Sequence, residues 1–302
     1  MTPPKIHLPH ELALLLALAT LWGASYTLIR VAVETIPPLT LMAARTAIAG
    51  TLLLAVLRAR GLRMPVGKAI WVRLVLQACL NSAIPFTLIA WAEQSIDAGM
   101  ASILNSTTPI FTFLITVLVT RHERVKAGGL LGVIAGLAGT CLIIGLPALS
   151  GLGDDLWAQL AMLAAAVCYA GAAICGRHFR GLDPLVPAAG SLLCAALLLT
   201  PLSLAIDRPW MLTPSPASLL ALAGLSVLST ALAFALYFRL IRTLGSLGTT
   251  AQGYLRVPIA IAIGIAFLGE SLTATALAGL ACILAGVAAM TLTGRRVAKA
   301  GV

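Results

Sequence analysis

The stretch from Gln252 to Pro258, inside an apolar segment, holds the residues of this chain best suited to bind a charged group. Pro258 has no backbone N–H, so a helix here loses one hydrogen bond, and Gly253 loosens the helix further. Gln252 and Arg256 are four positions apart and therefore share one helix face. A guanidinium facing a cavity can hold a carboxylate through two parallel hydrogen bonds. The alternative role for Arg256 is a structural one, bound to backbone carbonyls or to a neighbouring helix, and the sequence favours neither.

A second polar cluster, Asn105-Ser106-Thr107-Thr108, comes directly before Pro109 in another apolar segment. Ser and Thr hydroxyls commonly bind the backbone carbonyls that a proline leaves without a donor. Contact of Asn105 and Thr108 with a substrate is the equally weighted alternative. Each of the two clusters therefore combines a helix-bending proline with side chains that can bind a polar solute.

Arg45 lies one or two helical turns after the Pro37-Pro38 pair, where its guanidinium can reach outward or bind carbonyls at a helix end. We therefore favour a structural role for Arg45. The other polar residues in apolar segments that are candidates for lining a cavity are Asn81, Ser229, Thr230 and Tyr237, and Pro85 is a candidate hinge.

Five aromatic residues lie within apolar segments, and they are Trp22, Tyr26, Tyr169, Tyr237 and Tyr254. Buried phenols need hydrogen-bond partners. As a set these residues favour an aromatic-lined cavity suited to solutes with apolar or aromatic groups, whereas helix packing explains any one of them equally well. Trp71, Trp157 and Trp210 lie at segment ends, as is typical of the membrane interface.

The elements that must position these residues are apolar segments of membrane-spanning length. With 60% hydrophobic and 10% charged residues, the chain has too little polar surface for a water-soluble globule. Runs of roughly 20 apolar residues cross a bilayer as helices, which pair their own backbone groups. We therefore predict an all-α membrane protein with ten transmembrane helices and no soluble domain. The predicted ranges are 12–32, 39–57, 70–92, 99–120, 127–146, 157–176, 185–206, 216–238, 247–268 and 274–293.

The charged residues are sorted between alternate connections. If the N-terminus is cytoplasmic, the tails and inner connections hold 16 of the 20 Lys and Arg residues, and most acidic residues lie in the outer connections. The positive-inside rule then places both termini in the cytoplasm. The net charge of +10 is explained by this distribution, so we predict the lipid bilayer as a partner and no nucleic acid.

The sequence shows no residue pattern typical of a metal site, a cofactor site or an enzyme active site. The six cysteines lie inside apolar segments without ligand spacing, and the four histidines lie in the tail or inner connections. We therefore predict no metal, no cofactor and no catalytic residue, and consider a polytopic membrane enzyme or a channel to be unlikely alternatives to a carrier.

An internal repeat appears when the chain is shifted by 147 positions, which aligns Trp22 with Tyr169 and Gly132 with Gly279. We predict two repeats, residues 1–147 and 148–302, each with five helices. Because five is odd, the second repeat enters the membrane from the opposite side. Inverted repeats are typical of secondary transporters, in which the two halves exchange roles around a central site. Gly128, Gly132 and Gly136 recur every four positions, which predicts close helix packing within the chain or in a homo-oligomer.

The chain resembles the EamA-type carriers of the drug/metabolite transporter superfamily along nearly its whole length. The resemblance rests on Leu21-Trp22-Gly23-Ala24-Ser25-Tyr26, on Pro37-Pro38 followed by Arg45, and on Ala101-Ser102-Ile103-Leu104 leading to Pro109. In the second half it rests on Ala223-Gly224-Leu225-Ser226 leading to Tyr237, and on Phe267-Leu268-Gly269-Glu270 after Pro258. Two departures are Thr120-Arg121-His122-Glu123, where the family usually has Leu-Gly-Glu, and Arg256, where a neutral residue is more usual.

The resemblance implies a bacterial inner-membrane carrier that exports small metabolites, amino acids first, through a cavity between the halves. Efflux of drug-like or other small solutes is the alternative. No acidic residue is clearly central in a segment, so we predict facilitated transport or exchange, with proton coupling through Glu93 as the minor alternative. The predicted hinges are Pro85, Pro109, Gly253 and Pro258.

Overall fold

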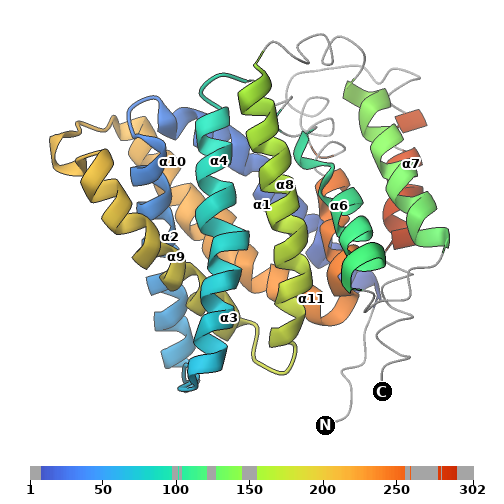
Figure 1. Cartoon of the computed structure of the whole chain (residues 1–302), viewed down its shortest axis with the longest axis horizontal. Coiled ribbons are helices and arrows are strands. Elements are labelled where there is room, and N and C mark those ends of the chain that lie inside the picture. Colours follow the sequence, from blue (N-terminus) through green and yellow to red (C-terminus); the bar gives the residue numbers. More distant parts are fainter. Residues whose placement is uncertain are drawn as a thin grey trace.

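The protein is a bundle of helices (Figure 1). The computed structural model describes residues 8–96, 101, 104–120, 127–144, 155–255, 259, 278–279 and 281–290, and every regular element within them is a helix. Two predicted site residues, Arg256 and Pro258, lie outside the described residues. The prediction of an all-helical chain is confirmed for the part that the structure describes.

Within the described residues, six helices are long and apolar enough to cross a membrane. They are α1 (Leu8–Val33), α2 (Pro38–Ala59), α3 (Lys68–Ala78) continuing through η1 (Cys79–Ala83) into α4 (Ile84–Ala92), α8 (Leu156–Cys175) with η4 (Gly176–Phe179), α9 (Leu185–Ile206), and α10 (Pro216–Ser226) continuing through η6 (Val227–Leu232) into α11 (Ala233–Thr250). Five of these helices coincide closely with the predicted segments, and the sixth, Pro216–Thr250, extends beyond the predicted range 216–238.

The other described helices are shorter than these six. They are α6 (Thr108–Leu114) with η2 (Ile115–Thr120), α7 (Ala127–Ile144) and the helix Ala281–Met290. A short turn, η5 (Pro209–Met211), lies in the connection between α9 and α10.

Proline and glycine set two helix boundaries. α2 begins at Pro38 with Pro37 as its N-cap, and proline is favoured there because the first helical N–H has no intrahelical partner. Gly245 has a left-handed backbone (φ 77°), which breaks the run of helix that includes α11. The predicted end of this segment at residue 238 was therefore too early, and the break at Gly245 precedes the predicted start of the next segment at 247.

Two helices are interrupted by a π-helical turn at matching places. η1 spans Cys79–Ala83, and η6 spans Val227–Leu232, so a shift of 147 positions superposes most of one on the other. Pro85 explains η1, because it cannot donate the regular bond and the N–H of Ile84 instead reaches Cys79, five residues back. In η6 the Thr230 hydroxyl bonds to the carbonyl of Leu225, also five residues back. Such turns are frequent at functional sites.

The same shift relates whole helices. α2 and α9 are both 22 residues long and begin 147 positions apart. In space, α1 packs against α10 and α11, α2 packs against α9, and α4 packs against α8. The two halves of the chain are therefore interlocked, and any space between them is lined by both.

The glycines of α7 serve packing within the chain. A Cβ added to Gly132 would lie 2.8 Å from the Gly286 carbonyl oxygen, and one added to Gly286 would lie 2.6 Å from the Gly132 oxygen. Only glycine permits this approach of the two backbones. The small residues thus join α7 to the helix Ala281–Met290, while a homo-oligomer through these helices stays a prediction.

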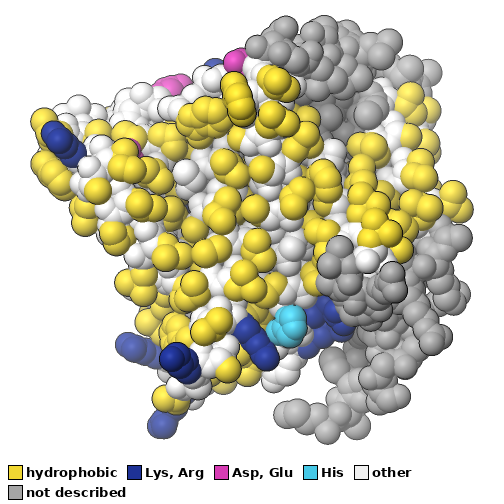
Figure 2. All heavy atoms as spheres, in the orientation of Figure 1, with side chains coloured by type: hydrophobic (Ala, Val, Ile, Leu, Met, Phe, Trp, Pro, Cys, Tyr) yellow, Lys and Arg dark blue, Asp and Glu magenta, His cyan; other side chains and the backbone are white. Residues whose placement is uncertain are grey.

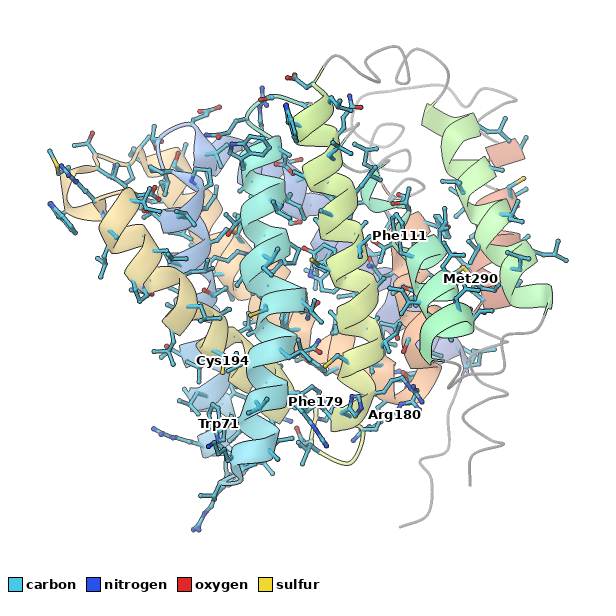
Figure 3. All side chains as sticks on the ribbon, viewed as in Figure 1. Trp71, Phe111, Phe179, Arg180, Cys194 and Met290 are labelled. Atoms are coloured by element: carbon cyan, nitrogen blue, oxygen red, sulfur yellow. The ribbon has the colours of Figure 1, made fainter. Side chains whose placement is uncertain are left out.

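Side-chain types are layered along the bundle. In Figure 2 a broad hydrophobic band separates one end, where most of the visible Lys and Arg side chains gather, from the opposite end, where Asp and Glu lie. Trp71, Phe179 and Arg180 lie at the Lys- and Arg-rich end (Figure 3). The indole of Trp71 donates to the Pro65 carbonyl at 2.8 Å, while Trp157 and Trp210 are largely exposed. This arrangement is typical of a chain that crosses a bilayer.

Candidate functional site

A cavity is lined by residues of α1, α2, α4, α6, α8 and α11. The space that is free of atoms amounts to about 680 Å³, including the part open to solvent. Its lining residues are Trp22, Ser25, Tyr26, Ile29, Arg45, Asn81, Phe86, Ile89, Asn105, Thr108, Tyr169, Tyr237, Thr250, Gln252 and Gly253. Both halves of the chain contribute to this lining.

The structure brings most of the predicted substrate-binding residues together at this cavity. They are Trp22, Tyr26, Asn81, Asn105, Thr108, Tyr169, Tyr237 and Gln252, and the predicted hinge Gly253 lies among them. Pro85 is buried at the start of α4, directly after η1, and Pro109 is buried in the first turn of α6. The two prolines predicted to be hinges thus lie close in sequence to the cavity-lining residues Asn81 and Thr108.

Two of the predicted residues lie elsewhere. Tyr254 is fully buried, its ring is packed near Gly136, and its hydroxyl donates to the Val133 carbonyl of α7 at 3.1 Å. Ser229 lies behind the lining, where its hydroxyl donates to the Leu21 carbonyl at 2.7 Å. Neither hydroxyl faces the cavity, because each is used to join helices.

Arg45 is the only charged side chain among the described lining residues. It is 2% exposed, its Nε donates to the Thr230 hydroxyl at 2.6 Å, and its Cζ lies 4.0 Å from the centre of the Phe86 ring. The two terminal nitrogens have only long contacts, 3.5 Å from Nη2 to the Ser229 carbonyl and 3.8 Å from Nη1 to the Met42 sulfur. The guanidinium is thus fixed through Nε while its outer edge lacks a strong acceptor among the described residues. Arg45 therefore both joins helices, through Thr230 and Phe86, and lines the cavity.

The polar cluster before Pro109 makes the backbone hydrogen bond that was predicted for it, while substrate contact by Asn105 and Thr108 stays a prediction. Pro109 cannot donate to the Asn105 carbonyl, and the Thr108 hydroxyl donates to it instead at 2.7 Å. The Asn105 side-chain amide meanwhile donates to the Tyr26 hydroxyl. This bond links α1 to the start of α6 across the cavity wall.

Aromatic rings form one side of the cavity. The centres of the Trp22 and Tyr237 rings are 5.5 Å apart, and Phe234 packs edge-on against Trp22 at 6.3 Å. The indole N–H of Trp22 donates to the Ser229 carbonyl of η6 at 3.1 Å, a carbonyl that the π-helical turn leaves available. These contacts hold the rings in fixed positions, as a preorganised site requires.

Sequence reasoning missed Ser25, Ile29, Phe86, Ile89 and Thr250 as lining residues. The aliphatic and phenyl side chains carry no signal that separates a cavity wall from ordinary helix packing. For Ser25 a signal existed, because it lies in the same six-residue motif as Trp22 and Tyr26. Its hydroxyl donates to the Trp22 carbonyl at 2.6 Å.

Glu93 lies just beyond the end of the α3–α4 span and outside the lining. It is fully buried, and neither carboxylate oxygen has a hydrogen-bond partner among the described residues. Burial raises the pKa of Glu93 to about 8 from an ordinary value of 4.5, against the opposing charges of Arg45 on α2 and Arg30 on α1. Arg30 donates to the backbone carbonyl of Glu93 at 2.6 Å. Asp155, the N-cap residue of α8, is exposed.

The raised pKa of Glu93 predicts that the folded protein loses stability as pH rises from about 4.5 to 8. In this range the folded state binds the proton more tightly than the unfolded state, so deprotonation favours unfolding. The stability of Glu93→Gln, whose side chain is neutral at every pH, should vary less with pH. At pH 8 this variant should be more stable than wild type. Thermal unfolding in detergent at several pH values measures this, with the exposed Glu34→Gln as the matched control. Identical pH profiles for wild type and Glu93→Gln would contradict it.

Comparison with known proteins agrees with this architecture. The model of the EamA-like transporter family matches twice, at residues 11–145 and 156–292. The chain is 28% identical over 279 residues to the uncharacterized inner membrane transporter YedA of Escherichia coli K12, covering 92% of this chain and 89% of YedA. It is 22% identical over 281 residues to the uncharacterized transporter YoaV of Bacillus subtilis, covering 92% and 96%.

The fold also has a counterpart among solved structures. A protein crystal structure with 19% sequence identity superposes with a TM-score of 0.74, covering 95% of this chain and 99% of the other. At this identity the likeness shows the fold alone. Because the family model matches both halves, the chain belongs to the EamA-like transporter family and is a multi-pass transporter of the bacterial inner membrane.

Proposed function

We propose that this transporter moves small metabolites bearing a carboxylate, amino acids first, and that Arg45 binds the carboxylate. The observation that carries the proposal is a single guanidinium in a cavity whose other described lining side chains are uncharged. A positive charge in such surroundings favours an anionic partner, and an arginine edge can bind a carboxylate with two hydrogen bonds. The aromatic rings of Trp22 and Tyr237 offer an apolar surface for the rest of the solute.

The proposed mechanism is alternating access between two inverted repeats of five helices, with both termini in the cytoplasm. The matching bounds of α2 and α9 and the matching turns η1 and η6 support the repeat. The sorting of charges to opposite ends supports the orientation. Export is the direction that the resemblance to EamA-type carriers implies, and rocking of the halves about the cavity would expose it to each side in turn.

Efflux of drug-like solutes is the second candidate. Many such solutes are cations, and Arg45 would repel a cation in this cavity at close range. For energy coupling we propose facilitated transport or exchange, because Glu93 lies outside the lining. Proton coupling through Glu93 is the alternative, and uptake driven by a pH gradient and abolished by Glu93→Gln would establish it.

The experiment that tests the substrate class is uptake of labelled amino acids, phenylalanine and threonine included, into liposomes that contain the purified protein. Unlabelled amino acids and their carboxamides, which lack the carboxylate, are then added as competitors. We expect saturable uptake that the amino acids inhibit at concentrations roughly tenfold lower than the carboxamides, because a charged hydrogen bond contributes about 1.5–3 kcal/mol. Equal inhibition by carboxamides, or no uptake of any carboxylate, would contradict the proposal.

A further inference from the structure

The cavity contains a second polar region, separate from Arg45, whose groups have no partner among the described residues. The Asn81 amide nitrogen Nδ2 and the Tyr237 hydroxyl both lack a hydrogen bond there. Asn81 is 2% exposed and Tyr237 is 4% exposed, and both line the cavity. Buried polar atoms without a partner are rare in folded proteins and reduce stability. Such atoms on a cavity wall are suited to bind a solute.

The local helix geometry explains why these atoms have no partner in the chain. Asn81 lies in the π-helical turn η1, where the wider helix turn alters the regular helix spacing. Gln77, one turn earlier, is fully buried, and its amide approaches the Tyr237 hydroxyl without reaching hydrogen-bond geometry. The Tyr237 ring is fixed by Trp22 and by Phe238, whose ring centres lie 5.5 Å and 5.1 Å away. The ring contacts therefore fix the position of the hydroxyl.

Tyr237 lies further along the chain than the residue that anchors Arg45. Arg45 is anchored on Thr230, and Tyr237 follows seven residues later, about 10 Å along the helix axis. The tyrosine side chain leans back toward the N-terminus of its helix, which shortens the distance between the two groups. A solute that reaches both must have several bonds between its carboxylate and its second polar group.

The chemistry of the region limits what that second group can be. No acidic or basic side chain other than Arg45 is among the described lining residues, so an ionised group beyond the solute's own adjacent α-ammonium and carboxylate would be buried without a counter-charge. The Asn81 amide nitrogen donates a hydrogen bond, and the Tyr237 hydroxyl can donate or accept. A neutral group that accepts a hydrogen bond from Asn81 and either donates to or accepts from Tyr237 is a hydroxyl or a carboxamide.

We propose that Asn81 and Tyr237 form a specificity subsite for a neutral hydroxyl or carboxamide group of the substrate. This inference rests on the proposed function, because it takes the carboxylate of the same solute to be bound by Arg45. It changes the expected preference: polar neutral amino acids should be favoured over the apolar ones that the aromatic lining alone indicates.

The test compares matched solutes in liposomes that contain the purified full chain. Tyrosine and phenylalanine have nearly the same shape and differ by a hydroxyl several bonds from the carboxylate, and glutamine and norleucine differ by a terminal amide. We expect tyrosine and glutamine to compete for uptake at least about fivefold better than their apolar counterparts, and Tyr237→Phe to remove most of this preference. Asn81→Leu is the second variant, and thermal unfolding checks that each variant is folded.

The matched control is Tyr254→Phe, which makes the same chemical change where the hydroxyl donates to Val133 and not into the cavity. It should keep the preference for tyrosine and glutamine. Uptake of carboxylates without this preference, or a preference that survives in both folded variants, would overturn the subsite while leaving the proposed function intact. No uptake of any carboxylate would overturn both. The subsite would then hold only water.

Discussion

Replacement of Arg45 by alanine should raise the half-saturation concentration for carboxylate substrates by about tenfold to a hundredfold. Charged hydrogen bonds contribute roughly 1.5–3 kcal/mol, and a tenfold change corresponds to about 1.4 kcal/mol. No other described lining residue carries a positive charge that could take over this role. Uptake by proteoliposomes over a range of substrate concentrations measures the change.

Arg45 also bonds to Thr230 and stacks on Phe86, so the variant must be shown to be folded. Arg45→Lys retains the charge but cannot reproduce the planar two-bond edge, and we expect an intermediate loss. Arg73→Ala removes an exposed arginine outside the cavity and should transport as wild type does. The distinguishing readout is the ratio of carboxylate to carboxamide competition. If that ratio is unchanged in folded Arg45→Ala, Arg45 has only a structural role.

Nothing in the sequence indicates that Arg45 reaches a cavity. Its position after Pro37-Pro38 favoured a structural role, and Arg256, which lies outside the described residues, was the candidate carboxylate ligand, with a structural role as the equal alternative. What brings Arg45 into the cavity is Thr230, 185 positions away in the chain, together with the ring of Phe86. Contacts at such separations follow from how helices pack, and one sequence without relatives carries no signal for them.

Helix positions were far more predictable than helix faces. The segments predicted at 39–57, 157–176 and 185–206 coincide with α2, α8 and α9, because runs of apolar residues between polar connections determine them directly. Trp22, Tyr26, Tyr169 and Tyr237 were expected at a cavity and line one. Tyr254 has the same residue type and a similar depth but packs near Gly136 of α7. In segments that are apolar on every side, periodicity does not separate a cavity face from a packed one.

The π-helical turns were not predicted from the sequence, although the cause of η1, a proline, is visible in it. Pro85 removes the donor that a regular turn would need, which favours the irregular turn before it. η6 has no proline, and the hydroxyl of Thr230 satisfies the freed carbonyl instead. A threonine in an apolar helix is too common for that signal to be recognised in advance.

A partly buried contact between α1 and α11 joins the first and second halves of the chain. Glu11, in the first turn of α1, is 4% exposed, and its carboxylate accepts from Arg239 at 3.1 Å and from Thr243 at 2.9 Å. Both partners belong to α11. Along α1 this contact lies eleven residues from Trp22, or about 16 Å from the cavity. It therefore joins the two halves at one end of the proposed pathway.

If the halves rock about the cavity as proposed, this contact must break each time that end opens. Glu11→Gln removes the charge while keeping the shape of the side chain, so it should favour the open state. A loss of about 1 kcal/mol from a half-exposed ion pair would increase the open fraction about fivefold. The measurement is labelling of a cysteine introduced at Thr250 in the cavity, in a background without the native cysteines, with a reagent applied from either side of oriented vesicles.

We expect Glu11→Gln and Arg239→Gln to label several-fold faster from the Lys- and Arg-rich end, and Glu34→Gln, an exposed acid in another part of the chain, to label as the parent does. Exchange of the two charges, Glu11→Arg with Arg239→Glu, should restore slow labelling, since the pair would form again with opposite polarity. Rescue of this kind separates a gate from general destabilisation, because two destabilising substitutions would otherwise add. Unchanged labelling in both single variants would show that the contact only stabilises the fold.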